Sequence, residues 1–332
     1  MVRYRGQIHE VKFISHPPSH LEYVVPQLSP QWFALRRPDN SVTFTASNVA
    51  ALIGFSKYAT AASAYAYILH SATDTEPEDT TGNQYTRAGQ KMEQPICDAF
   101  LRYLRPEYAE FGDAIKLRQV GIFASLSCPW ILASPDRILD CAAPGFTYHN
   151  YLVEIKFFCF SMPSAPRPEH LIQCTAQMFV AQSEAMFLVY ACGDQMQLFM
   201  VRFSKALWGW IFSCLEKLRT DLVARKPWEN QVSSHYHVLE SYWKSGTLSL
   251  AWKRACDCAT HRAWRTNNAS CAFKRRKTVV IGKERCDHLP PPPHVNLVCS
   301  TTDSQLGDDG FEVLLSEGFK SKSSTSSSSK FS

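Results

Sequence analysis

The stretch LVEIKFF at residues 152–158 predicts a β-strand with two unlike faces. Alternate residues of a strand point to opposite sides of the sheet, so its apolar residues share one side and its charged residues share the other. The apolar side carries Val153, Ile155 and Phe157. The opposite side carries Glu154 and Lys156.

A second motif, Ser134-Pro135-Asp136, lies upstream and is separated from this strand by a turn-rich stretch. The Pro144-Gly145 pair in that stretch is a turn signal, so the two segments are expected to pair as a hairpin. Pairing would bring Asp136 close to Glu154. Two carboxylates and a lysine on one face of an apolar hairpin repel one another and lose hydration unless a ligand binds there. A divalent metal ion is the simplest such ligand.

The composition excludes several classes of protein. The chain has 332 residues, of which 45% are hydrophobic and 20% charged, as in an ordinary globular protein of one or two domains. No apolar run approaches the roughly 18 residues that a membrane span needs, and residues 1–9 lack the apolar stretch of a secretory signal. The 12 cysteines are scattered singly, so we expect reduced thiols in the cytosol or nucleus.

Positive charge is concentrated near the C-terminal end. Between Lys244 and His288 lie eleven Lys or Arg and three acidic residues, although the whole chain carries only +5. This asymmetry suggests a polyanion contact outside the core. The cluster Lys274–Lys277 has three possible interpretations: a nuclear localisation signal, a phosphate-binding patch or a solvated tail. If it is a localisation signal, we expect the protein in the nucleus; otherwise we expect it in the cytoplasm. The Cys and His residues between 256 and 288 fit no standard zinc finger well.

The periodicity predicts a mixed α/β layout. Helices are expected at 30–36, 49–53, 93–105, 169–182 and 204–225, and strands at 115–123, 130–139, 151–159, 185–192 and 195–202. Pro95 fits the first turn of a helix, which favours a start near Glu93, and Ser47 is expected to be an N-cap. We divide the chain into an arm at 1–28, a core domain at 29–228, a basic and partly helical extension at 229–286, and a disordered tail at 287–332.

The carboxylates suggest phosphodiester hydrolysis. That reaction needs an activated water and a stabilised leaving oxygen, and one or two Mg²⁺ ions held by carboxylates supply both. Asp136, Glu154 and the backbone carbonyl of Ile155 would hold the ion, with Mn²⁺ as a substitute. Lys156 would orient the water and offset charge on the phosphate, and Glu93 would add a carboxylate.

Six motifs occur in an order that resembles one nuclease family. They are Trp32–Arg36, Thr45-Ala46-Ser47, Gly89-x-x-x-Glu93, Ser134-Pro135-Asp136, Glu154-x-Lys156 and Gln173-x-x-x-Gln177-Met178. Ser134-Pro135-Asp136 followed by Glu154-x-Lys156 looks like the PD-(D/E)xK nuclease signature. The whole series, over residues 29 to 202, resembles the lambda-exonuclease/YqaJ-type viral recombinase family.

The resemblance implies a fold and an activity. The fold would be restriction-endonuclease-like, a mixed central sheet flanked by helices, which makes 29–228 a PD-(D/E)xK nuclease domain. The activity would be Mg²⁺-dependent digestion of duplex DNA from the 5′ end, leaving a 3′ single strand for an annealing protein. The family includes rings, so a homotrimer encircling DNA is implied. By position, Asp136, Glu154, Lys156 and Glu93 match its catalytic residues.

The resemblance also implies a DNA-binding pocket. Arg36, Ser47 and Ser134 match the pocket for the terminal 5′ phosphate, which suits a guanidinium fork and hydroxyl donors. The remaining residues expected to contact DNA are Trp32, Gln173 and Gln177.

Two departures keep other functions open. Arg137 stands where the family usually has glycine, and Thr175 stands where it usually has glutamine. They leave two alternatives: a nucleic-acid-binding protein with an impaired active site, and an endonuclease or RNase of the same fold. Taken singly, Glu154-x-Lys156 could be a solvated strand face, Trp32 a core aromatic, Arg36 a surface charge, and Gln173 and Gln177 a pair on a helix surface.

Overall fold

The computed structural model describes residues 2–4, 7–13, 20–36, 42–71, 84–107, 109–141, 150–193, 195–228, 248–255 and 312–313. Its helices are α1 (Pro30–Arg36), α2 (Ala46–Leu52), α3 (Ala61–Ser71), α4 (Gln84–Glu107), the 3₁₀ helix η1 (Ala109–Ala114), α5 (Pro168–Ala181) and α6 (Lys205–Val223). Among the described residues, no helix is long and apolar enough to cross a membrane. Among the described residues, the seven cysteines form no disulfide bond.

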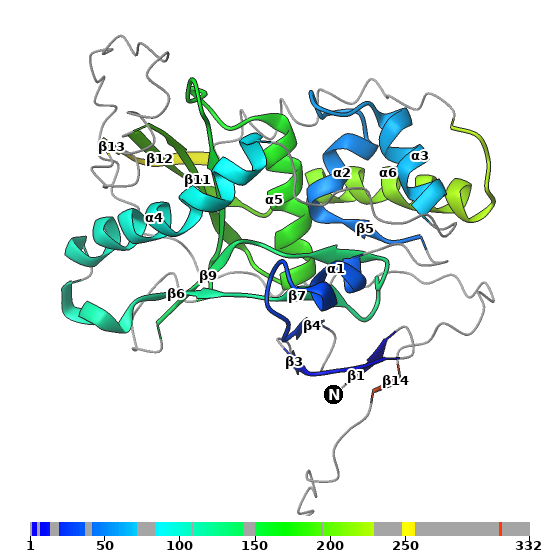
Figure 1. Ribbon diagram of the computed structural model, residues 1–332, viewed down its shortest axis with the longest axis horizontal. Coiled ribbons are helices and arrows are strands. Elements are labelled where there is room, and N and C mark those ends of the chain that lie inside the picture. The colour runs from blue at the N-terminus through cyan, green and yellow to red at the C-terminus, as the bar shows by residue number, and fades with distance from the viewer. Residues whose placement is uncertain are drawn as a thin grey trace, which may run out of the picture.

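The strands form three sheets (Figure 1). A six-stranded sheet has the order β13 (Leu248–Ala255), β12 (Gln195–Arg202), β11 (Ala185–Cys192), β10 (Leu152–Phe157), β9 (Arg137–Asp140), β6 (Lys116–Gln119). A five-stranded sheet has the order β3 (Val11–Phe13), β4 (His20–Tyr23), β7 (Ile122–Ser125), β8 (Ile131–Ala133), β5 (Phe44–Thr45). The third is β14 (Glu312–Val313), β1 (Val2–Tyr4), β2 (Gln7–His9). The predicted mixed sheet flanked by helices is confirmed.

The centre of the six-stranded sheet is buried on both faces. Strand β11 shows this directly, because all eight of its residues are buried. Phe187 and Val189 pack with Phe100 of α4 in one cluster, whereas Met186 and Leu188 belong to the cluster that contains α5 and α6. Strands β10 and β11 run parallel, and α5 is the crossover between them, as a parallel pair requires.

Helix α5 lies where the two larger sheets meet and contacts strands of both of them. It begins at Pro168, which needs no hydrogen-bond acceptor at the first helical position, with Glu169 in the first turn. It ends at Gln182, which adopts the left-handed conformation with φ 51°. The predicted helix at 169–182 is confirmed to within a residue, and so is the hairpin of β11 and β12.

Two predicted strands are divided in the structure. The segment 115–123 becomes β6 and β7, and 130–139 becomes β8 and β9, with the members of each pair in different sheets. Gly121 marks the first division: a Cβ there would lie 1.9 Å from the Tyr23 carbonyl oxygen, so only glycine fits. Ser134-Pro135-Asp136 is the second division, which places this motif at the junction of the sheets.

The predicted start of the helix near Glu93 is wrong. Helix α4 begins nine residues earlier, at Gln84, and Pro95 lies near its middle. Proline cannot donate to the carbonyl of Lys91 there, which costs a hydrogen bond. Met92, Ile96 and Phe100 are buried in the core, and this packing holds the helix through the proline.

Three other expectations need correction. The segment 20–23, placed in an arm without regular structure, is the buried strand β4, paired with β7. Residues 248–255 form a strand rather than a helix and pair with β12. Thr45, not Ser47, is the N-cap of α2, and its N–H donates to Asn48 Oδ1 at 3.0 Å.

The remaining expectations for the C-terminal region are not tested. Lys274–Lys277 and the Cys and His residues between 256 and 288 lie outside the described residues. So does the tail at 287–332, apart from β14. The division into four segments therefore stays a prediction.

Candidate active site

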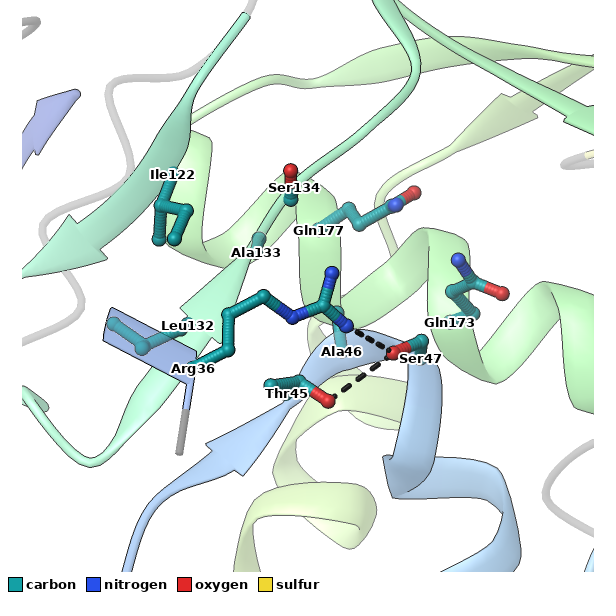
Figure 2. Close-up of a pocket in the computed structure, with 10 residues that line it drawn as sticks. All are labelled: Arg36, Thr45, Ala46, Ser47, Ile122, Leu132, Ala133, Ser134, Gln173 and Gln177. Atoms are coloured by element: carbon teal, nitrogen blue, oxygen red, sulfur yellow. Dashed lines mark hydrogen bonds between the residues drawn. The ribbon is translucent and has the colours of Figure 1, made fainter. Parts of the chain in front are cut away.

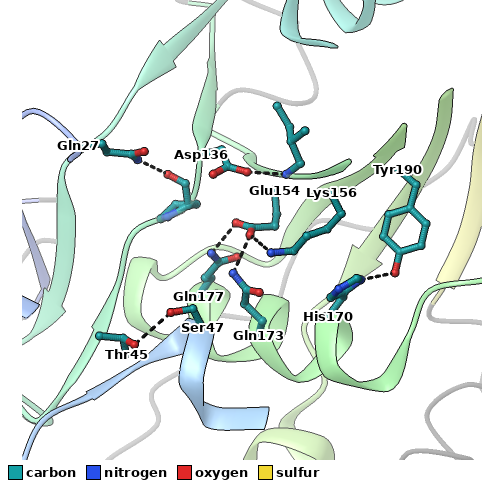
Figure 3. A network of polar contacts seen from close by, with 12 residues as sticks. Gln27, Thr45, Ser47, Asp136, Glu154, Lys156, His170, Gln173, Gln177 and Tyr190 are labelled. Atoms are coloured by element: carbon teal, nitrogen blue, oxygen red, sulfur yellow. Dashed lines mark hydrogen bonds and ion pairs between the residues drawn. The ribbon is translucent and has the colours of Figure 1, made fainter. Parts of the chain in front are cut away.

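Asp136 lies in the turn between β8 and β9, beside the central strand β10. Its Oδ2 accepts a hydrogen bond of 2.6 Å from the backbone N–H of Ile155 (Figure 3). Burial raises the pKa of Asp136 well above its usual range, and so do the neighbouring carboxylates of Glu154 and Glu93. The antiparallel pairing of β9 with β10 is as predicted, and it brings Asp136 beside Glu154.

The turn that carries Asp136 is held from several sides. Ser134 Oγ donates to the Gly121 carbonyl at 2.9 Å and accepts from Trp32 Nε1 at 2.9 Å. The side-chain amide of Gln27 donates to the Pro135 carbonyl at 2.8 Å and to the Val120 carbonyl at 3.0 Å. Asp136 therefore sits on a fixed support. No local pattern indicates this role for Gln27, because it lies in a stretch interpreted as an arm.

Glu154 is buried and accepts three hydrogen bonds (Figure 3). Its Oε1 accepts from Lys156 Nζ at 2.7 Å and from Gln173 Nε2 at 2.6 Å, and its Oε2 accepts from Gln177 Nε2 at 2.7 Å. The two glutamines lie one turn apart on α5, so both reach the same carboxylate. They are not a pair on a helix surface, and Glu154-x-Lys156 is not a solvated strand face.

Lys156 is a fixed positive charge in this cluster. Burial opposes its charged form, but the carboxylates of Glu154 and Asp136 outweigh burial and raise the pKa of Lys156 above its usual value. An ammonium group in this state donates hydrogen bonds and stabilises negative charge. It does not abstract protons.

Glu93 lies near the site but has its own partner. Its Oε1 forms an ion pair with Arg137 Nη1. Within the described part of the chain, no three His, Cys, Asp or Glu side chains come together as a metal site. We therefore treat Asp136 and Glu154 as the carboxylate pair, and the metal-ligand role expected of Glu93 stays a prediction.

This pair has the donor chemistry of a Mg²⁺ site. Magnesium is usually held by one or two carboxylates together with waters and substrate phosphates. The raised pKa of Asp136 reflects negative charge that a cation would relieve. The buried amide oxygen of Gln177 has no hydrogen-bond partner among the described residues, and a metal-bound water could donate to it. The residues present therefore fit a hard divalent ion.

A small pocket adjoins these groups (Figure 2). Its polar lining comes from five residues that were expected to contact DNA, namely Arg36, Ser47, Ser134, Gln173 and Gln177, and from Thr45, which was not. The sixth expected residue, Trp32, lies beneath the Arg36 guanidinium at 4.0 Å from the ring centroid. The structure therefore brings all six together.

Arg36 is positioned to receive an anion in this pocket. Its Nη2 donates to Ser47 Oγ at 2.9 Å, and Thr45 Oγ1 lies 3.1 Å from the same hydroxyl. Burial lowers the pKa of Arg36 to about 10, although Glu154 and Tyr67 counteract it. Serine at 47 is thus a pocket residue in the first turn of α2.

Thr175 does not contact the site. Its side chain is fully buried, and Oγ1 donates to the Leu171 carbonyl at 2.8 Å within α5. This departure from the family pattern therefore leaves the hydrogen bonds to Glu154 intact.

Comparison with known proteins points to the same family as the motif series. The model of the YqaJ-like viral recombinase domain matches residues 31–184. No curated protein matches the chain. Among solved structures, the alkaline exonuclease LHK-Exo from Laribacter hongkongensis is similar, with 21% identity over 65% of this chain and 98% of that one and a TM-score of 0.43. A phage-related exonuclease from Haemophilus somnus 129PT has 12% identity over 56% and 96%, with a TM-score of 0.37. The family model and the motif series therefore agree that residues 31–184 resemble a YqaJ-like viral recombinase domain.

Proposed function

We propose that this protein is a metal-dependent exonuclease that digests duplex DNA from an end, in the 5′ to 3′ direction, and leaves a 3′ single strand. One observation carries the proposal: the buried carboxylate of Glu154 connects Lys156 to two glutamines that also line the Arg36 pocket. A hydrolytic centre and an anion pocket thus share the same side chains. The YqaJ-like match supports the same chemistry.

The pocket would set which phosphate is cleaved. The Arg36 guanidinium offers a fork of donors, and the hydroxyls of Ser47 and Thr45 complete a cradle for a terminal phosphate. A phosphate held there would place the neighbouring phosphodiester toward Asp136 and Glu154. An end with a 5′ phosphate would therefore be preferred.

Asp136, Glu154 and the Ile155 carbonyl would hold the divalent ion. When bound, that ion supplies charge stabilisation and lowers the pKa of a bound water. Lys156 contributes a positive charge where negative charge grows on the phosphate. Gln173 and Gln177 orient the Glu154 carboxylate, as hydrogen-bond partners of metal ligands commonly do.

The test uses the purified full chain on linear duplex DNA. Three substrates are compared, with a 5′ phosphate, with a 5′ hydroxyl, and as a closed circle, each with Mg²⁺, with Mn²⁺ and with EDTA. We expect digestion of linear DNA only, fastest with the 5′ phosphate and abolished by EDTA. Asp136→Asn and Glu154→Gln should be inactive. The control Glu216→Gln changes an exposed carboxylate on α6 and should keep the activity of the wild type.

Other outcomes would point to the alternatives. Cleavage of the circle or of RNA would indicate an endonuclease or an RNase. Salt-dependent DNA binding without cleavage would indicate a nucleic-acid-binding protein with an impaired site. Equal cleavage by the wild type and both active-site variants would show that the site is misassigned.

The family resemblance extends the proposal to partners. A single-strand annealing protein would receive the 3′ strand, and a homotrimer would encircle the duplex. Sedimentation of the full chain, with and without DNA, measures whether it assembles as three copies.

A further inference from the structure

Arg137 is a buried guanidinium directly beside the carboxylate pair. Its side chain is 9% exposed. Nη1 pairs with Glu93 Oε1 and donates to the Asp136 carbonyl oxygen at 2.6 Å, and Nη2 donates to Gln94 Oε1 at 3.4 Å. A charge taken out of water in this way requires a counter-charge, and Glu93 provides it.

The ion pair with Arg137 determines whether Glu93 is available as a metal ligand. Among the described residues, the Glu93 carboxylate forms its ion pair with Arg137. Arg137 is anchored at its other nitrogen by Gln94, which lies on the same helix as Glu93. A metal ion that used Glu93 would have to displace or repel this guanidinium. Two cations beside one carboxylate in a poorly hydrated site repel each other strongly.

Counting the charges gives the same result. Asp136, Glu154 and Glu93 are three carboxylates, and Lys156 and Arg137 are two cations, so their ionised forms leave one negative charge. One divalent ion would make the site positive by one, and a phosphodiester group would then bring it to zero. Two divalent ions would leave two excess positive charges with the phosphate bound, against one if Arg137 were absent, so Arg137 makes a second ion less favourable.

We infer that Arg137 takes the place of a second metal ion beside Glu93, so that this site binds one divalent ion, on Asp136 and Glu154. Arg137 is then a positioning residue that acts through Glu93. The inference rests on the proposed function, because it assumes that the carboxylate pair holds a metal. Beyond the proposed function, it specifies how many ions the site binds and which residue sets that number.

A merely structural role for Arg137 makes a different prediction. Arg137 connects β9 to α4, so its loss could lower stability without changing the number of ions. Ion stoichiometry therefore separates the two roles, because a clamp between two elements has no reason to exclude a cation.

The experiment counts Mn²⁺ ions bound to the full chain without DNA. Titration calorimetry and the loss of the free-Mn²⁺ electron paramagnetic resonance signal each give the number of ions per chain. We expect one for the wild type and two for Arg137→Ala, since Glu93 is then released. Arg137→Lys should stay at one, because it keeps the positive charge. The double variant Arg137→Ala with Glu93→Gln should return to one.

Circular dichroism and thermal unfolding identify any variant that fails to fold. If Arg137→Ala does not fold, Arg137→Gln takes its place, because it keeps a polar side chain without the charge and should also bind two ions. Two ions on the wild type, with one on Glu93→Gln, would overturn the inference. So would one ion on a folded Arg137→Ala.

A failure of the proposed function gives a separate result. In that case the wild type would bind no Mn²⁺, or Asp136→Asn would bind as much as the wild type. One ion that is lost in Asp136→Asn but is unaffected by every change at Arg137 would leave the proposed function in place and refute only the role of Arg137.

Discussion

Gln177 Nε2 donates a hydrogen bond of 2.7 Å to Glu154 Oε2, and both side chains are almost fully buried. The bond joins α5 to the central strand β10 at the carboxylate that we assign to the metal. A buried carboxylate needs such donors, both to remain charged and to keep one orientation.

Gln177→Leu should therefore weaken metal binding or turnover by about 10–100-fold, the usual effect of losing a hydrogen-bond partner of a metal ligand. The leucine retains the volume of the side chain but donates no hydrogen bond to Glu154. Mn²⁺ affinity and the rate of linear-duplex digestion measure the effect. Gln90→Leu, at an exposed glutamine on α4, is the matched control and should change neither. Wild-type metal affinity in Gln177→Leu would refute the supporting role of this bond.

Arg36 should determine the preference for a phosphorylated end. A hydrogen bond to a charged group contributes about 1.5–3 kcal/mol, so Arg36→Ala should reduce the preference for a 5′ phosphate over a 5′ hydroxyl by about 10–100-fold. Arg36→Lys should recover only part of it, because lysine lacks the planar fork.

Digestion rates on the two substrates, measured at limiting DNA concentration, give the preference directly. Arg102→Ala removes an exposed arginine from α4 and should leave the ratio of rates unchanged. A ratio near the wild-type value in Arg36→Ala would mean that the pocket does not bind the terminal phosphate.

The parts of the site that follow from local pattern could be predicted from the sequence. The alternation in 152–158 correctly assigns Val153, Ile155 and Phe157 to the α4 side of the sheet and leaves Glu154 and Lys156 for the α5 side. The start of α5 follows from Pro168, and the shared face of its two glutamines follows from the helical period. Each of these features depends on residues that are close in the chain.

The parts that depend on distant contacts could not be predicted. Gln27 binds the Pro135 carbonyl across 108 residues, and nothing local to Gln27 indicates this contact. Pro95 favours a helix start, but tertiary burial of Met92 and Ile96 overrides that preference. The pairing of Glu93 with Arg137 requires α4 to pack on this sheet, where it contacts β10 and β6, and the order of elements leaves this open.

Gly121 should be among the least replaceable residues of the fold. An added Cβ would lie 1.9 Å from the Tyr23 carbonyl oxygen, which is backbone and cannot move aside freely. The Gly121 carbonyl also accepts the bond from Ser134, so a shift there would disturb the turn that carries Asp136. We expect Gly121→Ala to lower the free energy of unfolding by about 1–3 kcal/mol or more, as overpacking typically does.

Urea denaturation of the full chain measures this loss. Gly209→Ala, in the middle of α6 with nothing within 4 Å of the new Cβ, is the control. It should be neutral or should stabilise by about 0.5–1 kcal/mol, because alanine favours helix over glycine. Equal stability of the two variants would contradict the crowding at Gly121.

Two buried histidines should make the fold sensitive to acid. Burial lowers the pKa of His170 to about 2 and the pKa of His20 to about 4, from a usual value of 6.5. Above pH 6.5 the two imidazole rings are neutral in both the folded and the unfolded protein, so their contribution to the free energy of unfolding does not change with pH. Below pH 6.5 the histidines of the unfolded chain become protonated, whereas those of the folded chain stay neutral. The free energy of unfolding therefore falls as the pH falls, by about 1.4 kcal/mol per pH unit for each histidine that is still neutral in the folded chain.

The variant His170→Asn measures how much of this pH dependence comes from His170. The asparagine can keep a bond to the Tyr190 hydroxyl, which lies 2.6 Å from His170 Nδ1, but it does not titrate. Between pH 6.5 and 4.5 the unfolding free energy of the variant should therefore fall by about 1.4 kcal/mol less per pH unit than that of the wild type. Asp136, with its raised pKa, acts in the opposite direction but is common to both proteins. Tyr190→Phe should lower stability at every pH without changing the slope, and identical slopes for His170→Asn and the wild type would show that His170 is protonated in the folded state.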